Sequence, residues 1–120
     1  MTLSTLSLAC QAKQEFKSVD VAEFAKAVAD TTYTVLDVRT PSEYAEGHIP
    51  GTDFNIDVLN ENFTPRALAT LPKDKSVALY CRSGNRSKSA AKILTEQGYT
   101  VVELGSGIKG WIGAGKPIER

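Results

Sequence analysis

Val77-Ala-Leu-Tyr-Cys-Arg-Ser-Gly-Asn-Arg-Ser87 is the stretch around which this chain is organised. Residues 77–80 are apolar and have the composition of a buried strand, and a helical pattern resumes near Ser87 and continues to Gln97. Between them lies a short polar turn with two arginines and a glycine. The stretch therefore predicts a strand, a tight turn and a helix, with Cys81 where the strand ends.

Cys81 is the candidate nucleophile of this stretch. A free cysteine has a pKa of about 8.5, and a helix N-terminus together with neighbouring arginines lowers it. Arg82 and Arg86 supply the charge, and Gly84 allows the turn to direct backbone N–H groups toward an anion. A lone cysteine at a strand end is more often a packing residue. The arginines, the glycine and the helix start so close together favour a thiolate instead.

Strand and helix patterns alternate along the rest of the chain with short connections. Helix N-cap spacing occurs at Asp20 with Glu23, and at Thr40 with Pro41 and Glu43. The other expected strands are 15–19, 33–38, 52–56 and 100–104, and the other expected helical segments begin near residues 21, 41, 64 and 108. This alternation predicts an α/β fold with a central, mostly parallel five-stranded sheet and helices on both faces. Ligands in such folds bind outside the carboxyl ends of the strands, where Cys81 would lie.

Composition limits the possible functions. The 120 residues fit one domain, and 14 basic side chains balance 14 acidic ones, so no overall basic field suggests a nucleic-acid partner. The cysteines, Cys10 and Cys81, and the single histidine lack the spacing of metal ligands. No apolar stretch approaches the roughly 18 residues needed for a transmembrane segment.

The N-terminal segment has two interpretations. Residues 1–14 are expected to be either a flexible leader or the remnant of an export signal, with the domain in residues 15–120. The small and apolar residues that end in Ala-Cys10 look like a lipoprotein signal, although a basic start is absent. A lipidated Cys10 would place the protein in the periplasm or cell envelope. Otherwise it would be cytoplasmic.

Three separated motifs resemble those of rhodanese domains. Residues 36–51, Leu-Asp-Val-Arg-Thr-Pro-Ser-Glu-Tyr-Ala-Glu-Gly-His-Ile-Pro-Gly, are similar to the N-terminal signature of that family. Residues 81–87 resemble its active-site loop, and residues 107–111, Gly-Ile-Lys-Gly-Trp, resemble its C-terminal signature. The similarity covers about residues 16–117, and the length is that of the single-domain form.

The resemblance implies a ping-pong sulfurtransferase that needs no cofactor. The Cys81 thiolate would take sulfane sulfur from a small anionic donor, either thiosulfate or a persulfide or polysulfide. The resulting persulfide would pass the sulfur to cyanide or to a thiol acceptor, either a small thiol or a thioredoxin-like protein. The residues implied in substrate binding are Arg82, Ser83, Gly84, Asn85 and Arg86.

Two alternative functions share this architecture. A cysteine phosphatase of the same architecture would have one more residue between the cysteine and the arginine than the four between Cys81 and Arg86. A non-catalytic binding or regulatory module would resemble family members that have lost the cysteine, which is present here. Among the sulfur donors that the family uses, Arg82 and Arg86 favour a dianion such as thiosulfate over mercaptopyruvate.

Five further residues are expected to have structural roles near the site. Asp37 and Arg39 end the second strand, and the spacing predicts that Arg39 pairs with Glu43 and fixes a turn. Ser87 is expected to act as a loop or cap donor, because nothing basic is placed to activate it. Trp111 is expected to pack the C-terminal segment against the core.

Overall fold

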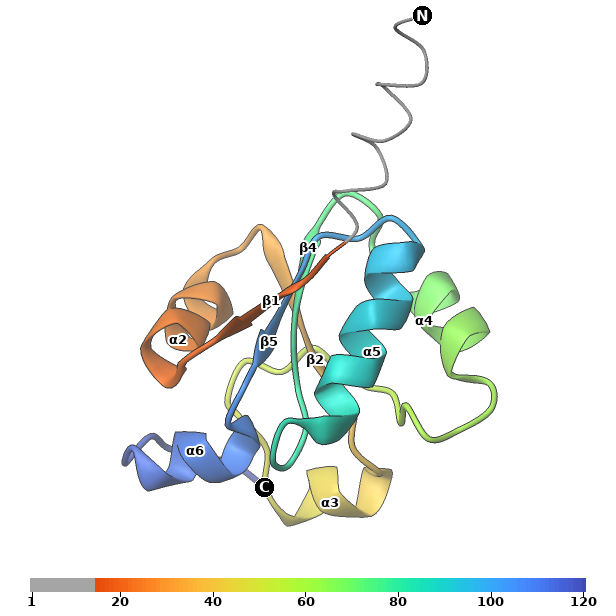
Figure 1. The fold of residues 1–120 in the computed structure, drawn as a ribbon. Helices are drawn as coiled ribbons and strands as arrows, with labels where there is room; N and C mark the ends of the chain where they lie inside the picture. The colour runs from red at the N-terminus through yellow and green to blue at the C-terminus, as the bar shows by residue number, and fades with distance from the viewer. Residues whose placement is uncertain (1–14) are drawn as a thin grey trace, which may run out of the picture.

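The computed structural model describes residues 15–120 as an alternating series of strands and helices (Figure 1). In chain order the elements are β1 (Lys17–Val19), α2 (Val21–Ala29), β2 (Tyr33–Asp37), α3 (Pro41–Glu46), β3 (Phe54–Asn55), α4 (Phe63–Thr70), β4 (Ser76–Tyr80), α5 (Asn85–Glu96), β5 (Val101–Leu104) and α6 (Gly107–Gly113). The interpretations of residues 1–14, including lipidation of Cys10, lie outside the described residues. No helix in residues 15–120 is long and apolar enough to cross a membrane.

The five strands form one sheet in the order β1-β5-β4-β2-β3. Every pairing in it is parallel, so the prediction of a mostly parallel five-stranded sheet is confirmed. β4 is the central strand and pairs with β2 over its whole length, from Tyr33 beside Ser76 to Asp37 beside Tyr80. The carboxyl ends of β2 and β4 therefore lie at the same edge of the sheet.

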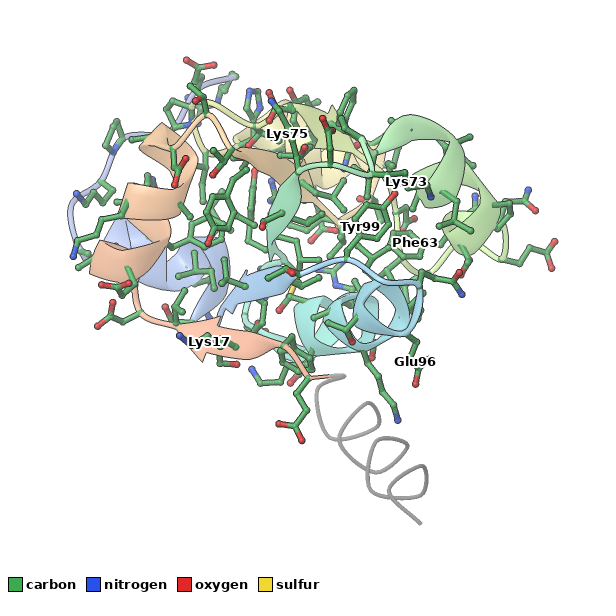
Figure 2. All side chains as sticks on the ribbon, turned by 90° about the horizontal axis from the view of Figure 1, so that it is seen from above. Lys17, Phe63, Lys73, Lys75, Glu96 and Tyr99 are labelled. Atoms are coloured by element: carbon green, nitrogen blue, oxygen red, sulfur yellow. The ribbon has the colours of Figure 1, made fainter. Side chains whose placement is uncertain are left out.

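Helices cover both faces of the sheet, as predicted. α4 and α5 lie on one face and α2 and α6 on the other (Figure 1). Side chains alternate along β4, so Val77 and Leu79 join the hydrophobic cluster of the first face and Ala78 and Tyr80 join that of the second. Phe63 and Tyr99, labelled in Figure 2, both belong to the first cluster.

Both predicted N-caps are present. The Asp20 carboxylate accepts the backbone N–H of Glu23 at 2.9 Å and starts α2. Thr40 and Glu43 form a reciprocal capping box at the start of α3, with Pro41 as its first residue. This cap holds the short helix α3 just beyond the carboxyl end of β2.

The start of α5 differs from the expectation. The sequence pattern predicts a start near Ser87, but the helix begins at Asn85 because Gly84, its N-cap, takes a left-handed conformation with φ of 105°. That conformation turns the chain sharply enough for Asn85 and Arg86 to enter the first helical turn. Only three residues, 82–84, therefore separate Cys81 from the helix.

Candidate active site

Cys81 directly follows the last residue of the central strand. It is a free thiol, it is only 1% exposed, and it packs at the end of the first hydrophobic cluster. The chain reverses through residues 82–84 into α5, so the sulfur lies at the N-terminal end of a 12-residue helix. Unpaired N–H groups and the helix dipole favour an anion at that position.

Hydrogen-bond donors of the loop converge on the Cys81 sulfur. The Gly84 N–H donates to Sγ at 3.1 Å. Burial raises the pKa of the Cys81 thiol, but the polar groups of the loop, namely the Ser87 hydroxyl and the N–H groups of Ser87, Gly84 and Ser83, outweigh it, so the pKa falls below its ordinary value. The loop can therefore stabilise sulfur in its anionic form.

Two glycines allow the loop to pack tightly against the turn between β5 and α6. A Cβ at Gly84, whose φ is 105°, would collide with the carbonyl oxygen of Gly105. A Cβ at Gly107, whose φ is 67°, would collide with the carbonyl oxygen of Arg82. Both positions require a residue without a side chain. Gly107, the first residue of the third motif, therefore allows the turn before α6 to contact the backbone of the Cys81 loop.

The N-terminus of α6 fixes the loop backbone. Ile108 N–H donates to the Cys81 carbonyl at 2.9 Å, and Lys109 N–H donates to the Arg82 carbonyl at 3.1 Å. The first N–H groups of a helix lack partners within the helix, and here the loop carbonyls satisfy two of them. These two loop carbonyls are therefore bound by α6, while the Gly84 N–H of the same loop donates to the Cys81 sulfur.

Arg86 forms the ion pair with Glu43, whereas the sequence spacing predicts that Arg39 does so. The Arg86 guanidinium donates to both carboxylate oxygens of Glu43, at 2.7 and 2.9 Å. The predicted pairing of Arg39 with Glu43 is wrong. Arg39 is buried and donates instead to Asp37, at 2.6 Å for the shortest contact, and to the Gly47 carbonyl at 2.8 Å. Local spacing permits both pairings, but α5 brings Arg86 to Glu43 and leaves Arg39 to the nearer carboxylate.

The two loop arginines thus differ in environment. Arg86 is clamped by Glu43, whereas Arg82 is exposed and forms no ion pair within residues 15–120. Arg82 lines a groove beside the loop that combines an apolar wall with charges of both signs. The groove residues are Arg39, Glu43, Glu46, Gly47, Arg82, Ile108, Lys109, Ile112 and Ile118.

The remaining predicted residues occupy different surroundings. Ser83 and Asn85 are exposed at the loop and the first turn of α5. Trp111 is buried in the second cluster, edge-on to Phe24, and its Nε1–H donates to the Pro117 carbonyl at 2.7 Å. It therefore ties the C-terminal segment to the core.

The sequence interpretation missed Glu103, a fully buried acid on β5. Its carboxylate accepts the hydroxyl of Ser87 at 2.6 Å. An acidic residue within an otherwise apolar strand, two residues before the turn that leads into the third motif, was the available signal.

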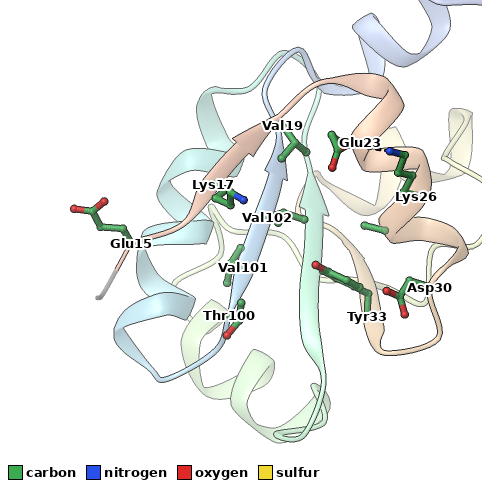
Figure 3. Close-up of a pocket in the computed structure, with 11 residues that line it drawn as sticks. Glu15, Lys17, Val19, Glu23, Lys26, Asp30, Tyr33, Thr100, Val101 and Val102 are labelled. Carbon is green, nitrogen blue, oxygen red and sulfur yellow. Dashed lines mark hydrogen bonds and ion pairs between the residues drawn. The ribbon is translucent and has the colours of Figure 1, made fainter. Parts of the chain in front are cut away.

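A second pocket lies away from Cys81. Figure 3 shows that Lys17, Glu23, Lys26 and Asp30, which carry charges of both signs, line it together with Tyr33. Its lining contains no residue of the 81–87 loop. Within residues 15–120, no cluster of three or more histidine, cysteine, aspartate or glutamate side chains is placed to hold a metal ion.

Comparison with known proteins agrees with this architecture. The family described as "Rhodanese-like domain" matches residues 20–114. The chain is 39% identical to a sulfurtransferase of Allochromatium vinosum, over 83% of this chain and 92% of that protein. It is 36% identical to a thiosulfate sulfurtransferase of Escherichia coli, over 62% and 69%.

A solved structure supports the same assignment. The crystal structure of a rhodanese-related protein from Thermoplasma volcanium has a TM-score of 0.74 and 34% identity, and the match covers 87% of this chain and 98% of that one. The family match spans more than half of the chain, and the curated relatives reported above are sulfurtransferases. The chain therefore belongs to the rhodanese-like domain family, as a sulfurtransferase of the rhodanese type.

Proposed function

We propose that the chain transfers sulfane sulfur through a persulfide on Cys81. In the first step the Cys81 thiolate attacks the outer sulfur of thiosulfate. A new S–S bond forms, the S–S bond of thiosulfate breaks, and sulfite leaves with the bonding electron pair. In the second step a thiolate or cyanide attacks the outer persulfide sulfur, and Cys81 leaves as the thiolate.

The observation that carries this proposal is the set of donors around the Cys81 sulfur. Gly84 N–H lies 3.1 Å from Sγ, and the hydrogen bonds of the loop lower the pKa of the thiol despite its burial. A low thiol pKa helps both steps, because Cys81 is the nucleophile in the first and the leaving group in the second. The same N–H groups are positioned to stabilise a persulfide anion.

The donor that the loop suits best is a small dianion. Arg82 is exposed at the groove next to the loop, and its charge is available to steer thiosulfate toward the sulfur. A persulfide or polysulfide donor would use the same thiolate. The acceptor in the cell is proposed to be a thiol, either a small one or that of a thioredoxin-like protein.

Intact mass spectrometry after incubation with thiosulfate tests the reaction directly. The wild-type chain should gain the mass of one sulfur atom, and cyanide should remove it with formation of thiocyanate. Cys81→Ser should gain nothing, whereas Cys10→Ser should behave like the wild type. A wild-type chain that gains no sulfur from thiosulfate, a persulfide or a polysulfide would overturn the proposal.

The same preparation separates the two alternative functions. A phosphatase would release phosphate from p-nitrophenyl phosphate in a Cys81-dependent manner and gain no sulfur. A non-catalytic module would do neither. The proposal expects sulfur gain without phosphate release.

A further inference from the structure

Glu103 is a fully buried carboxylate on β5, where it lies beside Leu79 of β4, two residues before Cys81. Ser87 Oγ donates to Glu103 Oε1 at 2.6 Å. Ser18 Oγ donates to Oε2, and Lys88 Nζ lies 3.2 Å from the same oxygen. A carboxylate without solvent persists only with such partners, so three elements, β1, β5 and α5, are joined at this group.

Ser87 connects Glu103 to Cys81. Its side chain is fully buried and donates to the Glu103 carboxylate, and the same hydroxyl is one of the groups that lower the pKa of the Cys81 thiol. A serine hydroxyl carries one hydrogen and can donate to only one of two anions at a time. In this structure the hydrogen goes to Glu103, at a short, charge-assisted distance.

Within residues 15–120, the charged side chains found to act on Cys81 or to contact Glu103 are the cations Arg86 and Lys88. Arg86, on α5, acts electrostatically on Cys81, but it is held by Glu43 of α3. Lys88, also on α5, is half exposed, pairs with Glu103 and donates to the Gly84 carbonyl at 3.2 Å. β1 contributes the uncharged Ser18. Glu103 is therefore the anion whose influence on Cys81 would pass through the Ser87 hydroxyl.

We propose that Glu103 is a positioning residue that competes with Cys81 for the hydroxyl hydrogen of Ser87 and thereby restrains formation of the Cys81 thiolate. When the thiolate forms, Ser87 turns its hydrogen from Glu103 to the sulfur, and Glu103 keeps Ser18 and Lys88. The carboxylate thus limits how readily the free enzyme exposes its nucleophile. This inference rests on the proposed role of Cys81 and adds a residue that sets its reactivity.

The test measures the pH dependence of Cys81 alkylation by iodoacetamide in a Cys10→Ser background, where Cys81 is the only thiol. Glu103→Gln removes the competing anion, so the midpoint should move down by about one pH unit, a roughly tenfold larger ratio of thiolate to thiol below the midpoint. The rate on the alkaline plateau should fall, because a thiolate of lower pKa is a weaker nucleophile. An unchanged midpoint would make Glu103 purely structural and overturn the proposal.

A double-mutant cycle separates competition from simple charge. With Ser87→Ala present, Glu103→Gln should shift the midpoint much less than it does alone. An equal shift with and without Ser87 would mean that the carboxylate acts through space, contrary to the proposal. Ser18→Ala is the matched control, since it removes a donor from the same carboxylate without touching Ser87, and its midpoint should stay at the wild-type value. If Ser18→Ala shifted the alkylation midpoint as much as Glu103→Gln does, the shift would come from structural relaxation around the carboxylate, contrary to the proposal.

Glu103→Asp provides a second test should Glu103→Gln not fold, as checked by circular dichroism. It keeps the charge but withdraws the carboxylate by one methylene from Ser87. Competition predicts a lower midpoint, and an unchanged midpoint would overturn the proposal. Alkylation does not require sulfur transfer, so these outcomes are independent of the mass gain from thiosulfate that tests the proposed function.

Discussion

Glu43 and Arg86 form the ion pair that holds the candidate loop from the outside. The pair is bidentate and joins the capping-box residue of α3 to the first turn of α5. The hydrogen bond from Arg86 holds the pKa of Glu43 at about 2, against an ordinary 4.5, and the Thr40 backbone adds to the effect. At the scale of single residues, Arg86 therefore orients the loop, while Arg82 remains available to a ligand.

Replacing Glu43 should remove part of the acid sensitivity of the fold. Because the folded-state pKa is lowered, the stabilisation is fully present above about pH 5 and is lost as the pH falls from 4.5 toward 2. Urea unfolding at a series of pH values should show that Glu43→Gln lowers the free energy of unfolding by about 2 kcal/mol at pH 7 and by little at pH 2.

Glu23→Gln is the control for this measurement. Glu23 pairs with Lys26 at 3.2 Å on an exposed face of α2, where an ion pair contributes little. Equal losses of stability for the two variants at pH 7 would contradict the role given to the partly buried pair of Glu43 and Arg86.

Arg82→Ala should weaken the use of thiosulfate without destabilising the fold. Arg82 is exposed and lines the groove, so we expect a several-fold increase in KM for thiosulfate, with kcat nearly unchanged. The difference from the wild type should shrink at high salt, because screening removes long-range steering. Arg66→Ala, on α4, is the control, and an equal effect there would point to overall charge rather than to Arg82.

At the scale of elements, the loop is a tight contact between two turns. Gly84 at the start of α5 and Gly107 at the start of α6 each lie where a Cβ would meet a carbonyl oxygen of the opposite turn. Hydrogen bonds from α6 to the carbonyls of Cys81 and Arg82 add to this contact. The loop geometry is therefore decided jointly by α5 and α6.

Gly84→Ala should be more damaging than glycine substitutions elsewhere. It combines a positive φ with a backbone collision, so we expect a loss of more than about 2 kcal/mol in unfolding free energy and a lower rate of sulfur transfer. Gly98→Ala has only the positive φ and should cost about 1 kcal/mol. Gly113→Ala has neither and should change stability by no more than about 0.5 kcal/mol. Chemical denaturation checks the order of the three, and equal losses would contradict the collision argument.

At the scale of the whole molecule, the two hydrophobic clusters share one sheet. Leu94 of α5 is fully buried in the first cluster, and Trp111 of α6 is buried in the second. Alternate side chains of β4 enter each cluster, so loosening one face should weaken the strand on which the other face packs. The two faces are expected to unfold together.

Leu94→Ala tests this coupling, because the single tryptophan of the chain lies on the opposite face. The cavity left by the substitution should lower the free energy of unfolding by about 2–5 kcal/mol. Tryptophan fluorescence and far-UV circular dichroism should show the same shift of the denaturation midpoint. Leu59→Ala, at a position 69% exposed, should leave it nearly unchanged. A fluorescence midpoint that does not move with Leu94→Ala would mean that the faces unfold independently.

The amino-acid sequence by itself determined the order of elements, the parallel sheet, the family and the place of Cys81 at the end of the central strand. These features depend on short-range patterns: apolar runs, helix caps such as Thr40 with Glu43, and a glycine three residues after the cysteine. The start of α5 was misplaced by two residues, because a left-handed glycine cap admits Asn85 and Arg86 to a helix that polarity alone assigns to a loop.

Only the tertiary structure decided which charged groups meet. Glu43 and Arg86 are 43 residues apart, and Ser18 and Glu103 are 85 apart, so spacing along the chain carries no information about these partners. The strand order places β5 between β1 and β4, so that Glu103 lies beside Leu79 on the strand that leads to Cys81. Sequence periodicity indicates which face of a helix or strand is buried, whereas the partners of a buried carboxylate are set by which elements lie next to one another in the sheet.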